Sequence, residues 1–560
     1  MSKAGAPEGG SAGAAASGGL FVFVPGLPVR RRGRPGWVPL IERLRDDLPD
    51  GWRVEVFEHG VHATSRTDPD EVVRHLAAQL RDWTGELSTD VEAPAEIILV
   101  GHSFGGVLAR AAFLQDAGTA DEPGHPWTRM VRRLVLLGSP NAGFRMDAPG
   151  TPAAWRLAYA LATPFFDFTI ESVQSGGYWI TDLRLRWLET FRRIQPKPDV
   201  IQVLGTSDWL VTKEDILDHR FMPNTTVYEI PGADHPGLIA IDDAPSPARR
   251  YEQLKTAILG RPDETPSPVK PIERVPTAFI LHGIRASALG TWVEDLATAY
   301  REAAGSADAL VVSPDTGYFT AAEFALPGTR RRKVHEFLKL YGDAYASRDP
   351  DLFVFAGHSN GTYMMARALD RVPSMRFQRI FLAGTVLPRG YEWQKRFDRR
   401  QVGHWVSEGE WEPGVIRNDR ATRDVPVGIL CSWLRGLGSA DVGTAGVNGF
   451  ENVSSATIDQ SRLIKGGHGA ALENGDQLAD IAAYLAAQPT RAVEDHKVST
   501  FFERASRAVG QGVLAWGVIA GVGVLAGRGL VAIGRARGTG AAVGTGVAGA
   551  VGVWTLLRSI

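Results

Sequence analysis

The chain has 560 residues, which is too long for one hydrophobic core and predicts two or three domains. Its formal net charge of −2 gives no overall field that would attract nucleic acid, so no nucleic-acid partner is expected. Cys431 is the only cysteine, which excludes an internal disulfide or a metal site built from cysteines and favours a reducing, cytoplasmic compartment. We expect neither a cofactor nor a metal.

The first part of the chain has an unusual composition. Residues 1–19 are mainly small and have no basic start followed by an apolar run, which predicts a disordered leader rather than a signal peptide. Four arginines then occur within 30–34. This basic loop is either a solvated loop or a contact for anionic lipid or substrate.

From residue 20 onward, apolar strands alternate with amphipathic helices. Strands are expected at 20–24 and 52–57, and helices from residue 37 and over 71–83. This alternation predicts a parallel sheet with helices on both faces.

A short run near residue 100 carries the strongest signal. Residues 97–106 read Ile-Ile-Leu-Val-Gly-His-Ser-Phe-Gly-Gly, an apolar strand that ends in a Gly-x-Ser-x-Gly turn, and a helix-forming run follows. Glycines must flank a serine on so tight a turn, and its hydroxyl is then exposed above the sheet. We therefore expect a nucleophile elbow at Ser103, with the amides of Phe104 and of Leu27, which follows the first strand, as oxyanion donors.

The segment after the next strand is rich in aromatic residues. An insertion at about 144–195 contains Trp155, Phe165, Trp179 and Trp187 among others, with little strand pattern. It is expected to form a lid over an apolar substrate pocket, and the alternative is an ordinary surface layer of helices.

An acid and a histidine follow in the order that a serine nucleophile needs. Asp208 ends an apolar strand and His235 follows the next one, so both lie at the sheet edge where ligands bind. The histidine would take the serine proton, and the carboxylate would hold the imidazole in the correct tautomer. Asp215 and Asp234 are weaker candidates for the acid, because neither directly ends an apolar strand.

Residues 20–258 resemble the lipase-like members of the α/β-hydrolase superfamily. The resemblance rests on Gly-His-Ser-Phe-Gly-Gly, Gly-Ser-Pro-Asn-Ala-Gly, Gly-Thr-Ser-Asp-Trp-Leu-Val and Ala-Asp-His-Pro-Gly. It implies Ser103 as nucleophile, Asp208 as acid and His235 as base. One departure is the oxyanion turn, where Pro25 stands in place of the usual histidine, so a side chain that often supports the loop is missing.

The same series of elements begins again after a proline-rich linker at 259–274. A second apolar strand leads into His282-Gly283, and a second elbow surrounds Ser359. The spacing from the turn glycine to the elbow serine is the same to within one position, from Gly26 to Ser103 and from Gly283 to Ser359. This match indicates a tandem duplication of the fold, with a second domain at 275–490.

The second domain offers two candidates for its acid. Asp424 is preferred, because its surroundings align with those of Asp208. Asp441 is the rival, since its separation from His468 equals the separation of Asp208 from His235 in the first domain. His468 is the expected base, and the amides of Ile284 and Asn360 are the expected oxyanion donors. The segment over 387–412 is short and charged, so this pocket is expected to be more open or more polar.

The end of the chain, 491–560, has a different character. Two runs without a charge, 508–527 and 538–557, flank a stretch with three arginines, and each run contains six glycines. Their length fits a bilayer, and their small residues would let two helices approach closely. We expect a membrane-associating helical hairpin over 508–557. A helical pair packed on the hydrolase body or on another copy, and disorder, are the alternatives.

These expectations combine into two tandem α/β-hydrolase domains and a glycine-rich tail. The expected activity is that of a serine hydrolase that cleaves carboxylic esters, with a lipid or another acyl ester as substrate. An acyltransferase would use the same triads. A membrane-perturbing effector or an inactive scaffold would use the hydrolase domains for docking or sensing.

Overall fold

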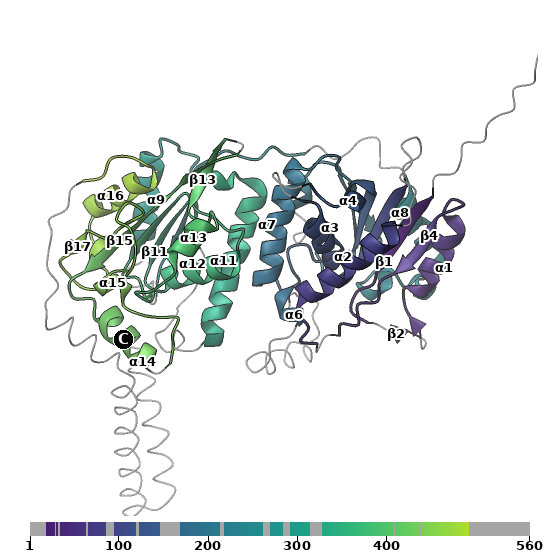
Figure 1. Cartoon of the computed structure of the whole chain (residues 1–560), viewed down its shortest axis with the longest axis horizontal. Helices are drawn as coiled ribbons and strands as arrows, with labels where there is room; N and C mark the ends of the chain where they lie inside the picture. The colour runs from purple at the N-terminus through teal and green to yellow at the C-terminus, as the bar shows by residue number, and fades with distance from the viewer. Residues whose placement is uncertain are drawn as a thin grey trace, which may run out of the picture. The chain divides into compact units, whose positions relative to one another are not determined.

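The computed structural model describes most of the chain between residues 18 and 491. The described ranges are 18–28, 30–31, 34–62, 65–85, 95–118, 123–145, 169–212, 218–260, 269–283, 292–313, 327–407, 409–436 and 438–491. The chain forms two compact units, Met1–Pro271 and Ile272–Ile560, and the boundary falls within the expected linker (Figure 1). The expected leader, except its last two residues, and the expected hairpin over 508–557 lie outside the described residues.

The first unit is built on a parallel sheet of six strands. Its order is β4-β1-β5-β6-β7-β8. The strands are β1 (Gly19–Val24), β4 (Arg53–Val56), β5 (Glu96–His102), β6 (Val131–Leu137), β7 (Asp199–Gly205) and β8 (Thr225–Ile230), and a small hairpin joins β2 (Arg30–Arg31) to β3 (Arg34–Pro35). The helices are α1 (Val38–Asp47), α2 (Pro69–Gly85), α3 (Phe104–Asp116), α4 (Pro126–Met130), α6 (Thr169–Ser172), α7 (Tyr178–Arg193) and α8 (Pro247–Leu259), with 3₁₀ turns η2 (Pro236–Leu238) and η3 (Ile241–Asp243).

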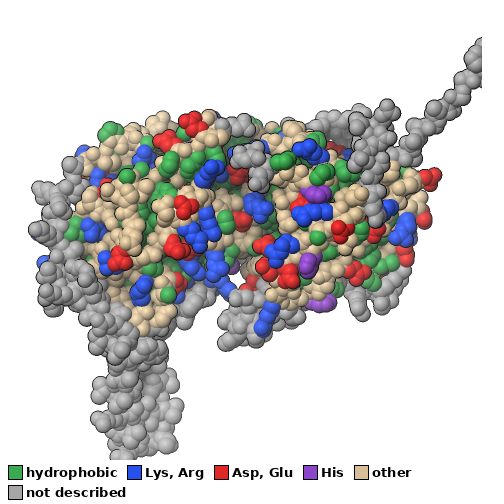
Figure 2. All heavy atoms as spheres, in the orientation of Figure 1, with side chains coloured by type: hydrophobic (Ala, Val, Ile, Leu, Met, Phe, Trp, Pro, Cys, Tyr) green, Lys and Arg blue, Asp and Glu red, His purple; other side chains and the backbone are tan. Residues whose placement is uncertain are grey.

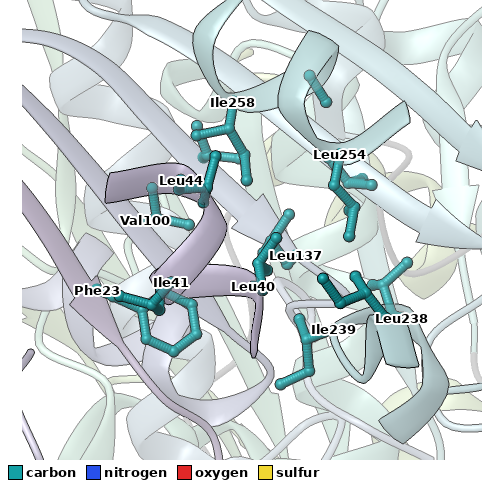
Figure 3. Close-up of a cluster of buried hydrophobic side chains, with 14 of the residues drawn as sticks. Phe23, Leu40, Ile41, Leu44, Val100, Leu137, Leu238, Ile239, Leu254 and Ile258 are labelled. Atoms are coloured by element: carbon teal, nitrogen blue, oxygen red, sulfur yellow. The ribbon is translucent and has the colours of Figure 1, made fainter. Parts of the chain in front are cut away.

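Helices cover both faces of this sheet (Figure 1). On one face, α1 and α8 bury a cluster of aliphatic and aromatic side chains against the strands (Figure 3). Phe23 and Val100 of the sheet meet Leu44 of α1 and Ile258 of α8 in this cluster. Strands that are covered on both faces must be apolar throughout, which explains the continuous apolar runs in the sequence.

The second unit repeats this strand order. Its sheet runs β10-β9-β11-β12-β15-β16, again parallel, and β17 also pairs with β15. The strands are β9 (Thr277–Leu281), β10 (Leu310–Val312), β11 (Phe353–His358), β12 (Arg379–Ala383), β15 (Val415–Ala421), β16 (Ile458–Asp459) and β17 (Leu463–Ile464), and an antiparallel hairpin joins β13 (Gly403–Ser407) to β14 (Glu410–Pro413). The helical segments are α9 (Trp292–Ala303), α11 (Pro327–Ser347), η5 (Pro350–Leu352), α12 (Asn360–Arg371), α13 (Trp393–Asp398), the π-helix η6 (Pro426–Cys431), α14 (Ser432–Gly436), α15 (Ala445–Asn448), η7 (Ala470–Leu472) and α16 (Gly475–Leu485).

The core of the second unit lies on both sides of this sheet. On one side, α9 and α16 pack against β9, β11 and β12. On the other, Phe279 of β9 lies within an aromatic cluster with Phe337 and Tyr341 of α11 at centroid distances of 6.1 and 5.3 Å. Over the face of each unit shown in Figure 2, positive and negative side chains are interspersed, in keeping with the small net charge.

The second half of the aromatic insertion in the first unit is a packed helix. Residues 146–168 lie outside the described residues, but α7 is described. Its Trp187 and Phe191 are buried, and the Trp187 ring lies 6.1 Å from that of Phe113 on α3. These two aromatic side chains therefore belong to a helical layer that packs on α3.

The segment at 387–412 in the second unit contributes to the hairpin β13–β14. The amide of Trp405 donates to the carboxylate of Asp351 at 3.1 Å, and Phe377 forms a bridge with Val402. Asp351 and Phe377 come just before β11 and β12, so the hairpin lies at the amino ends of these strands. Ser359 lies at the opposite, carboxyl end of β11, which this hairpin does not cover.

No helix within the described ranges is both long enough and apolar enough to cross a bilayer.

Candidate active site

Both serines occupy the strained turn expected of a nucleophile elbow. Ser103 joins β5 to α3 with φ 52° and ψ −124°, and Ser359 joins β11 to α12 with φ 54° and ψ −122°. A non-glycine residue at positive φ is strained and persists only where the surroundings hold it. A Cβ atom on Gly105 would lie 2.0 Å from the carbonyl oxygen of Val24, so this position must be glycine. The same close approach recurs at the second elbow.

In the first unit, the serine, histidine and acid form one hydrogen-bonded chain. Ser103 Oγ lies 2.8 Å from His235 Nε2, and His235 Nδ1 lies 2.8 Å from Asp208 Oδ2. The Asp208 side chain is fully buried, and its other oxygen accepts the amides of Leu210 and Val211. Because the ionised carboxylate only accepts, Nδ1 carries the imidazole proton and Nε2 is left to accept from the serine.

The two weaker acid candidates of the first unit do not join this chain in the described structure. Asp234 is exposed, and its carboxylate accepts the amide of Gly237 at 2.8 Å, which caps the turn after His235. Asp215 lies outside the described residues.

The expected oxyanion turn of the first unit lies against the serine. A Cβ atom on Gly26 would lie 2.7 Å from Ser103 Cβ, so only a glycine allows this approach. Among the described residues, the amides of Leu27 and Phe104 have no hydrogen-bond acceptor. Two amide donors beside a serine hydroxyl are the components of an oxyanion hole.

His59 supports this turn, although no pattern in the sequence indicates this role. Its Nε2 atom donates to the carbonyl of Pro25 at 3.0 Å, while its Nδ1 atom accepts the amide of Val61 at 3.0 Å. Its ring also meets Phe104 edge-on at 5.5 Å. Burial lowers the pKa of His59, and the Val61 amide requires an unprotonated Nδ1. His59 thus fixes the turn that lacks the usual histidine.

In the second unit, the structure pairs His468 with Asp424. His468 Nδ1 lies 2.8 Å from Asp424 Oδ2, and the Asp424 side chain is fully buried. Asp441 instead accepts from Arg330 at 3.1 Å and from the Tyr363 hydroxyl at 2.8 Å. It therefore ties its loop to α11 and α12.

The serine of the second unit is not yet joined to its histidine. Within the described residues, Ser359 Oγ forms no hydrogen bond with His468, although Ser359 is buried at the elbow. The His468 side chain is also more exposed than that of His235, at 20% against 10%. Asn360 occupies the position of Phe104, and Ile284 lies outside the described residues. Hydrogen bonds of this kind are often long without substrate and tighten when it binds.

The described residues contain no group of three or more His, Cys, Asp or Glu side chains that could hold a metal ion.

A family comparison decides the class of the first unit. Residues 21–252 match the sequence profile described as the alpha/beta hydrolase family. The first unit is an α/β-hydrolase. This α/β-hydrolase unit has its elbow, acid and histidine inside the matched range, and hydrolysis is the reaction class that the family indicates. The second unit repeats its strand order and its elbow, and so repeats the fold.

Several solved structures are similar at low sequence identity. The peroxisomal alpha-beta-hydrolase Lpx1 from Saccharomyces cerevisiae is 12% identical, with 45% of this chain and 80% of that chain covered and a TM-score of 0.29. The RedJ thioesterase from Streptomyces coelicolor is 18% identical, with 45% and 97% covered and a TM-score of 0.23. The esterase Est2 from Thermogutta terrifontis is 15% identical, with 43% and 83% covered and a TM-score of 0.27. No curated protein matches the sequence.

Proposed function

We propose that the chain is a serine hydrolase that cleaves carboxylic esters through an acyl-enzyme at Ser103. The observation that supports this proposal is the hydrogen-bonded chain from Ser103 through His235 to Asp208, with both distances at 2.8 Å. A serine hydroxyl is a weak nucleophile on its own, and an adjacent histidine oriented by a carboxylate is the arrangement that activates it.

Acylation follows from the positions of these atoms. Ser103 Oγ attacks the ester carbonyl carbon as His235 Nε2 takes its proton, and the carbonyl electron pair moves to oxygen. The amides of Leu27 and Phe104 stabilise that oxyanion, and Asp208 stabilises the imidazolium. The tetrahedral intermediate then collapses, the bond to the alcohol oxygen breaks, and His235 gives its proton to the departing alkoxide. An acyl ester of Ser103 remains.

Deacylation repeats these steps with water. His235 Nε2 takes a proton from a water molecule as the water oxygen attacks the acyl carbon, and the same two amides hold the oxyanion. Collapse breaks the bond to Ser103 Oγ, which recovers its proton from His235. The products are a carboxylic acid and an alcohol, and the enzyme returns to its starting state.

We propose the same roles for Ser359, His468 and Asp424 in the second unit, with the amides of Asn360 and Ile284 as oxyanion donors. The pairing of His468 with Asp424 supports the base and the acid. The step still required is the approach of Ser359 Oγ to His468 Nε2. A side-chain rotation at the elbow is the smallest movement that could bring the two atoms together.

The substrate and membrane parts of the proposal rest on the sequence. A lipid or another acyl ester suits the aromatic-rich insertion in the sequence of the first domain and a tail with two long uncharged runs. An acyltransferase remains the second candidate, because an alcohol could replace water in deacylation. An effector that perturbs membranes would need the tail but not the serines.

The experiment is ester turnover by the full chain and by three variants, Ser103→Ala, Ser359→Ala and the double variant. Ser246→Ala is the matched control, because Ser246 is exposed and its side chain caps nothing. We expect each single variant to lose part of the turnover, the double variant to lose all of it, and the control to be unchanged. Full turnover by the double variant would contradict the proposal, and acyl transfer to an added alcohol in preference to water would favour the acyltransferase.

A further inference from the structure

A histidine precedes each of the two serines, and both histidines make the same contact. His102 Nε2 lies 3.4 Å from the backbone carbonyl oxygen of His235, and His358 Nε2 lies 3.0 Å from that of His468. Both side chains belong to buried residues, with 5% and 2% of their surface exposed. The contact therefore links each elbow to the loop that carries the histidine of the site.

The carbonyl partner of His102 and of His358 determines which ring nitrogen carries the proton. A carbonyl oxygen only accepts, so Nε2 must carry a proton in both residues. The rings face the site histidines, with centroids 5.4 Å apart between His102 and His235 and 4.5 Å apart between His358 and His468. Burial and this second imidazole lower the pKa of His102 and of His358 to about 3. Each is thus neutral, with Nδ1 unprotonated.

We propose that His102 and His358 are positioning residues, each of which holds the site histidine of its unit by the backbone while remaining uncharged beside it. The proposal rests on the proposed function, in which His235 and His468 become imidazolium ions. A second positive ring at about 5 Å would oppose that protonation, whereas a neutral ring does not.

The recurrence of the contact argues that it is not incidental. The two elbows differ at the residue after the serine, which is Phe104 in one and Asn360 in the other. The surroundings also differ, because His358 lies 6.3 Å edge-on from Trp292. The link from Nε2 to the carbonyl is nevertheless present in both units. A loop held at one end by this link keeps the imidazole at a fixed distance from the serine, and a displacement of about 1 Å at such a site can cost about 100-fold in rate.

The test compares His102→Leu, which removes the donor, with His102→Gln, whose amide nitrogen can occupy the place of Nε2. Both are made in the full chain with Ser359→Ala, so that only Ser103 reacts. The measurements are the rate constant for labelling by a fluorophosphonate, and kcat and KM for an ester over pH 5–9. His75→Leu is the control, because His75 is exposed on α2. The thermal unfolding midpoint is recorded for every variant.

We expect His102→Leu to lower kcat and the labelling rate by about 10- to 100-fold with little change in KM. His102→Gln should recover most of the rate, and His75→Leu should react as the parent does. A parental rate in His102→Leu, or an equal loss in the leucine and glutamine variants, would overturn the proposal. If His102→Leu does not fold, the glutamine variant carries the test, and a loss of about 10-fold or more in it overturns the proposal. Absence of labelling at Ser103 in the parent would instead contradict the proposed function.

The second unit provides an independent repetition. His358→Leu and His358→Gln are made with Ser103→Ala, and labelling of Ser359 is followed in the same way. The same order of rates is expected, with glutamine above leucine. The opposite order in this unit would overturn the role of His358.

Discussion

Ser103 Oγ and His235 Nε2 lie 2.8 Å apart, whereas Ser359 Oγ has no hydrogen bond with His468 among the described residues. The first site is therefore assembled for proton transfer without substrate, and the second must first bring its two atoms together. A site that reorganises before each reaction spends part of the binding free energy on that step.

We predict that Ser103 supplies the larger share of ester turnover. Ser103→Ala should remove most of kcat for a small soluble ester, and Ser359→Ala should remove the smaller share. The measurement is steady-state kinetics of the two single variants at equal protein concentration. A larger loss of kcat from Ser359→Ala would contradict the idea that the hydrogen bond between Ser103 and His235 makes the first site the more active one.

The acid of the second unit can be assigned by a pair of variants in the full chain with Ser103→Ala. Asp424→Asn should lower the remaining activity by up to about 10⁴-fold, because the amide favours the wrong imidazole tautomer. Asp441→Asn should leave the rate nearly unchanged. It should instead lower the free energy of unfolding by about 1–3 kcal/mol, since it weakens the contact with the buried Arg330. The reverse ranking of the two rates would assign the acid to Asp441.

The acid of the second unit could not be chosen from the sequence alone. Asp424 and Asp441 both remained candidates for the acid of the second unit. Asp424 matched Asp208 by its sequence surroundings, and Asp441 matched it by its separation from the histidine along the chain. Distance along the chain does not determine distance in space when an insertion such as 426–448 folds back between strand and histidine. The apolar strands and the two elbows were predictable, since both depend on local pattern.

His59 could not be predicted in the same way. Its partner Pro25 is far away along the chain, and only the parallel pairing of β1 with β4 brings the two loops together. The missing histidine at the turn was visible in the sequence, but nothing local indicated which residue replaces it. Trp187 could not be assigned to a lid or to a helical core from the sequence for a related reason, because aromatic side chains favour both.

We predict that His59→Phe lowers kcat for the first unit by about 10- to 100-fold with a smaller effect on KM. Phenylalanine retains an aromatic ring beside Phe104 but loses the donor to the Pro25 carbonyl, so the amide of Leu27 is held less firmly. The kinetics are measured with Ser359→Ala, and His62→Phe is the control, because His62 is exposed in the same loop. An unchanged kcat in His59→Phe would show that the turn does not need this support.

Acid should destabilise the protein through its buried neutral histidines. The pKa of His102 is about 3 in the folded state and about 6.5 when unfolded, so below pH 6.5 the unfolded state binds the extra proton. The stability that a neutral His102 contributes is thus present above pH 6.5 and is lost as the pH falls towards 3. The slope for one such group is about 1.4 kcal/mol per pH unit within this window.

We predict that His102→Gln reduces this slope by the equivalent of one proton. The measurement is the free energy of unfolding for the transition in which the first unit unfolds. It is taken from denaturant titrations at several pH values between 3.5 and 6.5. An unchanged slope would mean that the pKa of His102 is the same in the folded and unfolded states, and would contradict the neutral, buried imidazole.

For the tail, we predict that the full chain sediments with lipid vesicles and that a chain ending at Thr500 does not. The shortened chain should still react at both serines, because the described units end before that point. The measurement is vesicle sedimentation with and without alkaline carbonate, which removes peripheral proteins. Equal recovery of both chains in the supernatant would assign the two glycine-rich runs to packing against protein.

The most direct test of the account is to identify the residues that a fluorophosphonate labels in the intact chain. Peptide mass spectrometry should find the adduct on Ser103 and on Ser359, with Ser103→Ala and Ser359→Ala each removing one adduct and leaving the other. A protein in which neither serine is labelled, although the chain is folded, would contradict the proposal that the two elbows carry activated nucleophiles.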